Sequence, residues 1–263
     1  MMKRALCGWP LWIFLAGTLS AVWFHTDVAA DSSLTAGQME NWQLSVLHSN
    51  RALELESKGQ VEEAVVEYRK AIELDPKASA PYANLGTLSM SMGNLEGAEH
   101  LFKKAIRLDA DIPAFHTNLA NVYYYKADYN RAIQEYRIAL EQDPNLAVTH
   151  ASLGDAYLQK GLQNLAIRHI RKAIELDPRN ALAYNNLGEY HYKSGAYAEA
   201  EEAFQKALEI EPKLSASYHY LGLMAEEKGD RKRAREFFIL ALRASTSVRE
   251  AEDAKQQIEA LAP

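Results

Sequence analysis

The chain has 263 residues, of which 48% are hydrophobic and 24% are charged, and this composition excludes a disordered acidic protein and a collagen-like fibre. Acidic residues outnumber basic ones by 35 to 29, so the chain lacks the basic surplus that favours binding to nucleic acid or anionic lipid. The only cysteine, Cys7, cannot form a disulfide framework or a cysteine-ligated zinc or iron–sulfur site.

Residues 1–30 have the layout of a secretory signal peptide. Lys3 and Arg4 come before a long apolar run, and small side chains at Val28 and Ala30 come before a polar stretch. We therefore expect cleavage after Ala30, with the rest of the chain exported to the periplasm or secreted.

An uncleaved membrane anchor is the alternative for the same segment. Residues 5–24 are long enough to span a bilayer if Gly8 and Pro10 are tolerated. Because Lys3 and Arg4 favour the cytoplasmic side, an anchored chain would also display its remaining residues on the exported side. In either case, contact with the membrane is expected only through this N-terminal segment.

The rest of the chain repeats with a period of 34 residues. Asp-Pro dipeptides begin at Asp75, Asp143 and Asp177, which are separated by two periods and by one. A series of small residues keeps the same step: Gly59, Gly93, Ala127, Gly161, Gly195 and Gly229. An alanine series follows it: Ala64, Ala98, Ala132, Ala166, Ala200 and Ala234. A third series carries large apolar side chains: Tyr68, Phe102, Tyr136, Ile170, Phe204 and Phe238.

Each period predicts two helices, as residues 181–214 illustrate. The spacing of the first half places four side chains on one helical face: Tyr184, Leu187, Gly188 and His191. Gly195 is typical of a helix end, and Glu211-Pro212 closes the second helix. The second helix has its own apolar face: Ala200, Phe204, Ala207 and Leu208.

The pattern Tyr184-x2-Leu187-Gly188-x2-His191, Ala200-x3-Phe204 and Pro212 resembles the tetratricopeptide repeat (TPR). Six units match it: 45–78, 79–112, 113–146, 147–180, 181–214 and 215–248. The departures are His or Tyr where the family has Trp, and Thr246 in place of the last Pro. The resemblance implies an all-α fold, a right-handed α-solenoid of stacked antiparallel helix pairs.

Both ends of the repeat array are predicted to differ from its middle. Residues 31–44 are expected to extend the first helix backwards, with Met39 and Trp42 packing against the first repeat. Arg51 occupies a position that holds leucine in the other repeats, which suits a unit with no predecessor. Residues 249–263 predict a C-terminal capping helix with a polar back and one apolar face: Ala251, Ala254, Ile258 and Leu261. These polar ends argue against end-to-end stacking, so we expect a monomer.

Motifs for chemistry are missing from the sequence. It contains no His-Glu-x-x-His zinc motif, phosphate-binding glycine loop or nucleophile elbow. His48, His116 and His150 share one repeat position, which we interpret as packing in place of an aromatic residue; a metal or pH-sensing ladder is the alternative. We therefore expect no enzymatic activity, cofactor or metal.

The resemblance implies that a second stripe on each first helix lines a concave, peptide-binding surface. Its predicted apolar floor is Met90, Tyr124, Leu158 and Tyr192. Its predicted polar rail is Asn121, Asp155 and Glu189. Smaller side chains complete it: Thr87, Thr117 and Asn185. The alternative interpretation is that the four floor residues fill gaps between repeats.

The TPR resemblance implies binding of a protein or peptide segment, in the manner of a scaffold or assembly factor. An accessory subunit that docks on an envelope enzyme or secretion complex through its outer face is the alternative. A self-associating structural protein is a third hypothesis, against which the polar ends argue.

Overall fold

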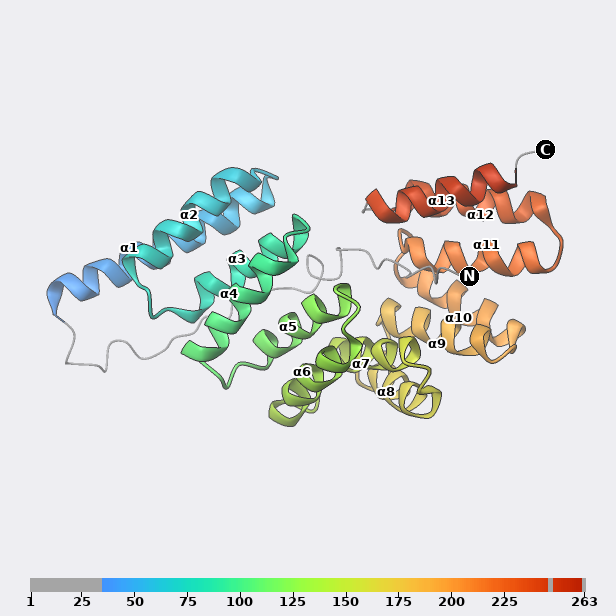
Figure 1. Ribbon diagram of the computed structural model, residues 1–263, viewed down its shortest axis with the longest axis horizontal. Coiled ribbons are helices and arrows are strands. Elements are labelled where there is room, and N and C mark those ends of the chain that lie inside the picture. The colour runs from blue at the N-terminus through green and yellow to red at the C-terminus, as the bar shows by residue number, and fades with distance from the viewer. Residues whose placement is uncertain (1–34, 246–247, 262–263) are drawn as a thin grey trace. The chain divides into compact units, whose positions relative to one another are not determined.

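The computed structural model describes residues 35–245 and 248–261, and these residues form thirteen α-helices and no strand (Figure 1). The proposed signal peptide or anchor, residues 1–30, lies outside the described residues. The helices are α1 (Ala36–Ser57), α2 (Val61–Leu74), α3 (Ser79–Ser91), α4 (Leu95–Leu108), α5 (Pro113–Tyr125), α6 (Tyr129–Gln142), α7 (Ala147–Gln159), α8 (Gln163–Leu176), α9 (Ala181–Lys193), α10 (Tyr197–Ile210), α11 (Ser215–Glu227), α12 (Arg231–Ala244) and α13 (Val248–Ala260).

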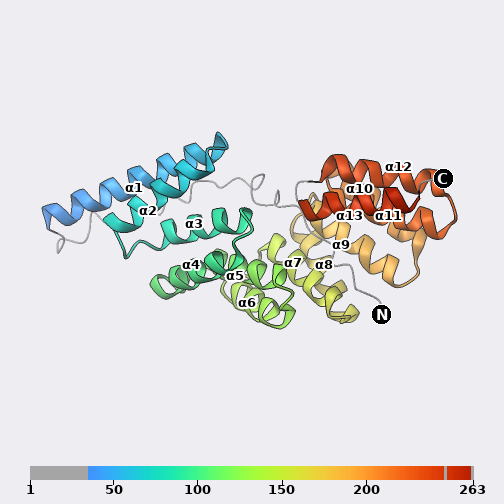
Figure 2. The same ribbon diagram turned by 45° about the horizontal axis from the view of Figure 1, so that its top comes forward.

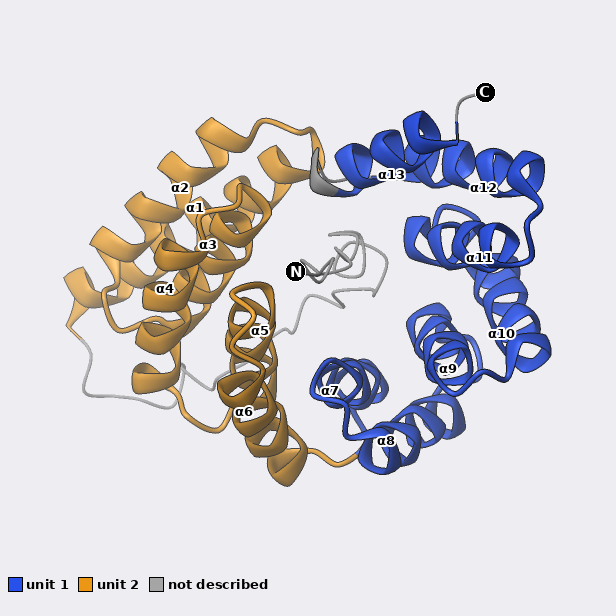
Figure 3. Cartoon of the chain, turned by 45° about the vertical axis from the view of Figure 1, so that its right-hand side comes forward, with its two compact units in different colours: residues 1–19, 145–263 blue, residues 20–144 orange. Residues whose placement is uncertain are grey.

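The helices group into two compact units, shown in separate colours in Figure 3. Among the described residues, the N-terminal unit comprises residues 35–144 and the C-terminal unit residues 145–261. Within each unit, consecutive helices pack as antiparallel pairs, and each pair packs on the next one along the chain (Figure 2). The all-α, stacked-pair architecture predicted from the 34-residue period is therefore present.

The turn inside each pair explains the series of small residues. Five of its members have a left-handed backbone, with φ between 73° and 78°: Gly59, Gly93, Gly161, Gly195 and Gly229. Glycine adopts this conformation without the steric penalty that a Cβ brings. Ala127 takes the same place in the third pair with φ of 58°, so the turn persists there without glycine.

The core of each pair is a large side chain from the second helix set against a small residue of the first. All six large residues are at most 1% exposed: Tyr68, Phe102, Tyr136, Ile170, Phe204 and Phe238. A Cβ built on Gly188 would lie 2.6 Å from the ring of Phe204, and one on Gly222 would lie 2.7 Å from that of Phe238. Glycine at these positions therefore lets the two helices approach.

The two ends of the described chain differ from its middle. Helix α1 continues back to Ala36, and Thr35 caps it by accepting a hydrogen bond from the Gln38 amide. Arg51 is exposed, whereas Leu85 is buried at the equivalent position of the next repeat. At the other end, α13 packs against α12. Its buried side chains include Ala254, and Leu261 just after it joins the cluster around Phe238.

Candidate functional site

The predicted binding stripe of the N-terminal unit is largely covered by neighbouring side chains. Met90, Thr117 and Asn121 are buried, with exposed fractions of 3%, 7% and 7%. Thr87 and Tyr124 are half-buried. Helices α3 and α5, which carry these residues, contact each other directly. Of the two apolar floor residues in this unit, only Tyr124 therefore presents substantial surface.

The stripe of the C-terminal unit follows the same division. Four members are buried, with exposed fractions of 3% or less: Asp155, Leu158, Asn185 and Glu189. Tyr192 is half-buried, and its hydroxyl donates to Glu227 over 2.6 Å. Helices α7, α9 and α11 contact one another in succession, which closes the gaps between first helices. Leu158, like Met90, therefore packs between helices instead of forming an open floor.

The rail residue Asn121 has an unsatisfied hydrogen-bonding group. Its Oδ1 accepts a hydrogen bond from the hydroxyl of Tyr136, the large core residue of the same pair. Its Nδ2 is buried and makes no hydrogen bond with any described residue. A buried amide donor without a partner is rare, because it has lost water and gained nothing in exchange.

The rail residues Asp155 and Glu189 are joined by a polar bridge. Gln159 Nε2 donates to Asp155 Oδ1 over 3.0 Å and to Glu189 Oε1 over 3.1 Å. Lys193 Nζ lies 2.5 Å from the same Oε1 of Glu189. The second carboxylate oxygen, Oε2, is buried without a hydrogen-bond partner among the described residues. Glu189 thus lies in the interior with one carboxylate oxygen unsatisfied among the described residues.

Buried asparagines link the first helices of three consecutive repeats. Ser217 donates to Asn185 Oδ1 over 2.8 Å, and Asn185 Nδ2 lies 3.5 Å from Asn186 Oδ1. Asn186 Nδ2 then donates to the carbonyl oxygen of Ala151 over 2.9 Å. Asn185, predicted as part of the stripe, therefore connects repeats and is fully buried.

The histidines at the shared repeat position contact side chains on the second helix of the same repeat, 19 residues later in the chain. The Nδ1 atoms of His48 and His116 lie 2.5 Å and 2.7 Å from carboxylate oxygens of Glu67 and Glu135. His150 instead meets His169, with 2.9 Å between their Nδ1 atoms. Burial and the neighbouring His150 lower the pKa of His169 to about 4. The three histidines thus contact side chains within their own helix pairs.

No metal-binding cluster accompanies these histidines in the part of the chain that the structure describes. No group of three or more His, Cys, Asp or Glu side chains there is arranged to hold an ion. The spacing of 19 residues between the partners is present in the sequence, but a comparison of equivalent positions in successive repeats does not connect two positions within one repeat.

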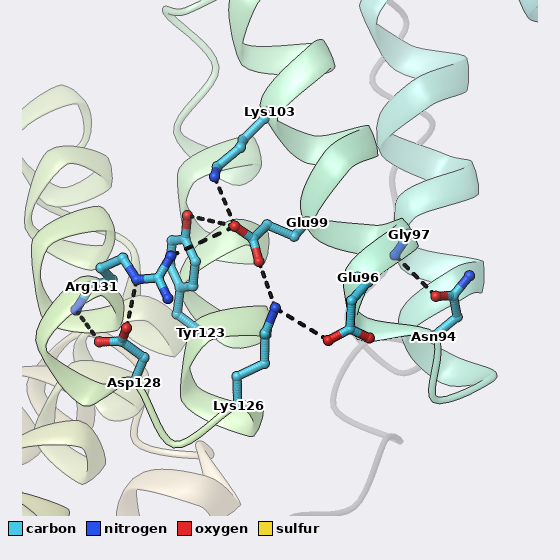
Figure 4. A network of polar contacts seen from close by, with 9 residues as sticks. All are labelled: Asn94, Glu96, Gly97, Glu99, Lys103, Tyr123, Lys126, Asp128 and Arg131. Carbon is cyan, nitrogen blue, oxygen red and sulfur yellow. Dashed lines mark hydrogen bonds and ion pairs between the residues drawn. The ribbon is translucent and has the colours of Figure 1, made fainter.

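A charged cluster on the N-terminal unit was not anticipated (Figure 4). Glu99 on α4 accepts hydrogen bonds from Lys103 at 2.7 Å, Lys126 at 2.8 Å and the Tyr123 hydroxyl at 3.3 Å. Arg131 places its guanidinium 4.3 Å from the centre of the Tyr123 ring. Burial raises the pKa of Glu99, but the bonds from the two lysines outweigh it and lower the pKa to about 2.

Sequence models of the tetratricopeptide repeat match residues 52–93, 80–112, 120–161 and 151–215, which together make up more than half of the chain. The chain belongs to the tetratricopeptide repeat family. A comparison with curated protein sequences finds no significant match. The TPR assignment supports a role in protein interaction, because repeats of this family present surfaces to other proteins.

Solved TPR structures resemble the chain along most of its length. A crystal structure of MamA is 26% identical, with a TM-score of 0.53, and the match covers 62% of this chain and 95% of that one. PilF of Pseudomonas aeruginosa is 20% identical, with a TM-score of 0.63 and coverage of 84% and 99%. PilW, described as a type IV pilus biogenesis factor, is 17% identical, with a TM-score of 0.66 and coverage of 80% and 98%. At these identities the PilF and PilW structures support the fold only.

Within residues 35–245 and 248–261, no helix has both the length and the apolar character needed to cross a membrane.

Proposed function

We propose that this TPR protein is an exported scaffold or assembly factor that binds an extended segment of another protein along its first helices. The family supports a protein-interaction role. The proposed contact surface is a part of the predicted stripe. It consists of the stripe residues whose side chains remain partly exposed and of the polar rail residues beneath them. The partner would be held by shape and hydrogen bonding, with no covalent chemistry.

The observation that carries this proposal is the pair of unsatisfied rail atoms. Asn121 Nδ2 offers a donor and Glu189 Oε2 an acceptor, one in each unit and both at the same position of their repeats. An unsatisfied buried polar group costs about 1–3 kcal/mol, so a ligand that satisfies it gains affinity. In each unit, a peptide backbone can offer the matching group, because every residue except proline carries both a backbone carbonyl and a backbone amide.

The surroundings of Glu189 allow access to its free oxygen. Gln159 and Lys193 bind its other oxygen, and both have part of their side chains in solvent. Long side chains of this kind change rotamer readily, which would expose the carboxylate to a donor from a partner. Tyr192 lies one helical turn away and supplies an aromatic contact, and Tyr124 does the same beside Asn121 in the other unit.

A peptide selection tests the groove. Peptides enriched from a displayed random library on the purified protein are measured by calorimetry against three variants. We expect the double substitution Tyr124→Ala and Tyr192→Ala to weaken binding by about 30-fold or more, because it removes both aromatic contacts and the loss of a single aromatic hot spot already costs roughly 30-fold. Glu189→Gln is expected to weaken it by roughly tenfold, because the acceptor loses its charge.

The matched control is Glu209→Gln, because Glu209 is exposed on α10 and, among the described residues, pairs only with Lys206. Helix content measured by circular dichroism must stay the same in all variants. Unchanged affinity in both groove variants would overturn the groove proposal and favour docking through the outer face, as an accessory subunit of an envelope complex.

Export is the second part of the proposal, and it rests on the layout of residues 1–30. Protein recovered from the periplasm or the medium should begin at Asp31 when its N-terminus is sequenced. An intact chain in the membrane fraction would establish the anchored alternative. An intact chain in the cytosol would rule out export.

A further inference from the structure

A hollow of about 270 Å³ lies between α10, α11 and α12 of the C-terminal unit. Its floor is apolar and includes Leu221, Ala225 and Phe237. Its rim carries charges, including Glu201 and Arg233. The hollow is many times larger than the 10–15 Å³ that one water needs. None of its lining residues belongs to the predicted peptide stripe, so it is a separate feature.

The N-terminal unit contains the same arrangement with the space filled. Glu99, Lys126 and Arg131 stand three repeat periods before Glu201, Lys228 and Arg233. Tyr123, three periods before Ala225, fills the space between its charged neighbours and is 3% exposed. Its hydroxyl lies 3.3 Å from Glu99 Oε1, and its ring lies 4.3 Å from the Arg131 guanidinium (Figure 4).

The C-terminal unit keeps the acidic residue and two of the basic residues of this cluster, but it has no aromatic ring at the repeat position of Tyr123. Glu201 pairs with Lys228 at 3.4 Å and with Arg233 at 3.1 Å, which reproduces the acid and two of its cations. Ala225 ends at a methyl group where Tyr123 carries a phenol. The Arg233 guanidinium is 5.4 Å from the Phe237 ring centre, looser than the contact between Arg131 and Tyr123. The hollow is therefore the space that a tyrosine side chain occupies in the other unit.

We propose that this hollow binds a tyrosine side chain from a partner protein. The hydroxyl donates to the carboxylate of Glu201, and the ring lies against Leu221 with its face towards Arg233. A carboxylate has about four acceptor positions, and two are used by Lys228 and Arg233, so capacity remains for the phenol. A guanidinium over an aromatic face adds attraction that an aliphatic side chain cannot provide. The hydroxyl contact favours tyrosine over phenylalanine.

Chemical-shift titration with N-acetyl-tyrosinamide tests the proposal, and N-acetyl-phenylalaninamide serves as the matched probe without a hydroxyl. We expect the tyrosine probe to perturb amides of α11 and α12 and to bind roughly tenfold more tightly than the phenylalanine probe. No perturbation of these helices up to the solubility limit of the tyrosine probe would overturn the proposal.

Two substitutions locate the binding. Ala225→Tyr supplies the missing ring from the protein itself and should abolish binding of the tyrosine probe. Glu201→Gln keeps the shape of the hollow and should remove most of the preference for tyrosine over phenylalanine, which gives a second readout if Ala225→Tyr folds poorly. The groove variant Tyr124→Ala with Tyr192→Ala should leave binding of the probe unchanged. Undiminished binding to Ala225→Tyr, or an unchanged preference in Glu201→Gln, would contradict the assignment.

Discussion

Replacing Phe204 with alanine is expected to lower the free energy of unfolding by about 3–5 kcal/mol. The side chain is fully buried, and its ring stacks on that of Tyr220 with 5.2 Å between centres and 8° between planes. It also lies against Gly188, which has no side chain to move into the space. The substitution therefore leaves a cavity in the α9–α10 pair and removes a contact with the next pair. Urea denaturation followed by circular dichroism measures the loss.

The matched control for Phe204→Ala is Leu240→Ala. Leu240 lies on the second helix of the neighbouring pair and is 37% exposed, so its removal should change the free energy of unfolding by about 0.5 kcal/mol or less. A loss below about 1 kcal/mol for Phe204→Ala would show that the pair collapses around the cavity, contrary to the rigid packing described here.

Asn186→Leu is expected to lower the free energy of unfolding by about 1–3 kcal/mol. Asn186 is fully buried and donates to the carbonyl oxygen of Ala151, in the first helix of the preceding repeat. Leucine has nearly the same shape but cannot donate, and it also leaves the buried Nδ2 of Asn185 without an acceptor. The same denaturation experiment detects the loss.

Asn118→Leu provides the comparison for this prediction. Asn118 occupies the equivalent position in the third repeat and is half-buried, so water can reach its side-chain amide. We expect its replacement to change stability by about 0.5 kcal/mol or less. Equal losses from the two substitutions would mean that the link between repeats contributes nothing beyond the propensity of asparagine in a helix.

The sequence predicted the repeat architecture well, because the period fixes both the helices and the turns. The unit at 181–214 gives α9 and α10, with Gly195 in the turn between them and Phe204 in the core. These features depend on contacts within one repeat or between adjacent repeats, and every copy of the pattern reports the same contact. Repetition thus turns a weak local signal into a strong one.

The accessibility of the stripe could not be read from the same pattern. Helical spacing assigns Met90 and Leu158 to one stripe, but their burial depends on how closely successive first helices approach. Tyr124 and Tyr192 share this repeat position and keep part of their surface. Equivalent positions in a repeat array therefore need not be equivalent in exposure.

The hollow beside Ala225 could not be predicted from the sequence for a different reason. The alternation of Tyr123 and Ala225 at one repeat position is visible in the sequence. The structural effect of this difference depends on Glu201, which lies on the second helix of the preceding repeat. A substitution at one position thus becomes a cavity only through a residue about 24 positions earlier, and single-helix periodicity does not connect the two.

The stacking of helix pairs on their immediate neighbours has a mechanical consequence. Within each unit the main contacts join helices of the same repeat or of adjacent repeats. A pulling force applied at the chain ends would meet no strand or helix that ties distant repeats of one unit together. The chain would then yield one hairpin at a time, each releasing about 11–12 nm of extended polypeptide. Such an array would extend in steps under load, and each unfolding hairpin would absorb part of the applied mechanical work.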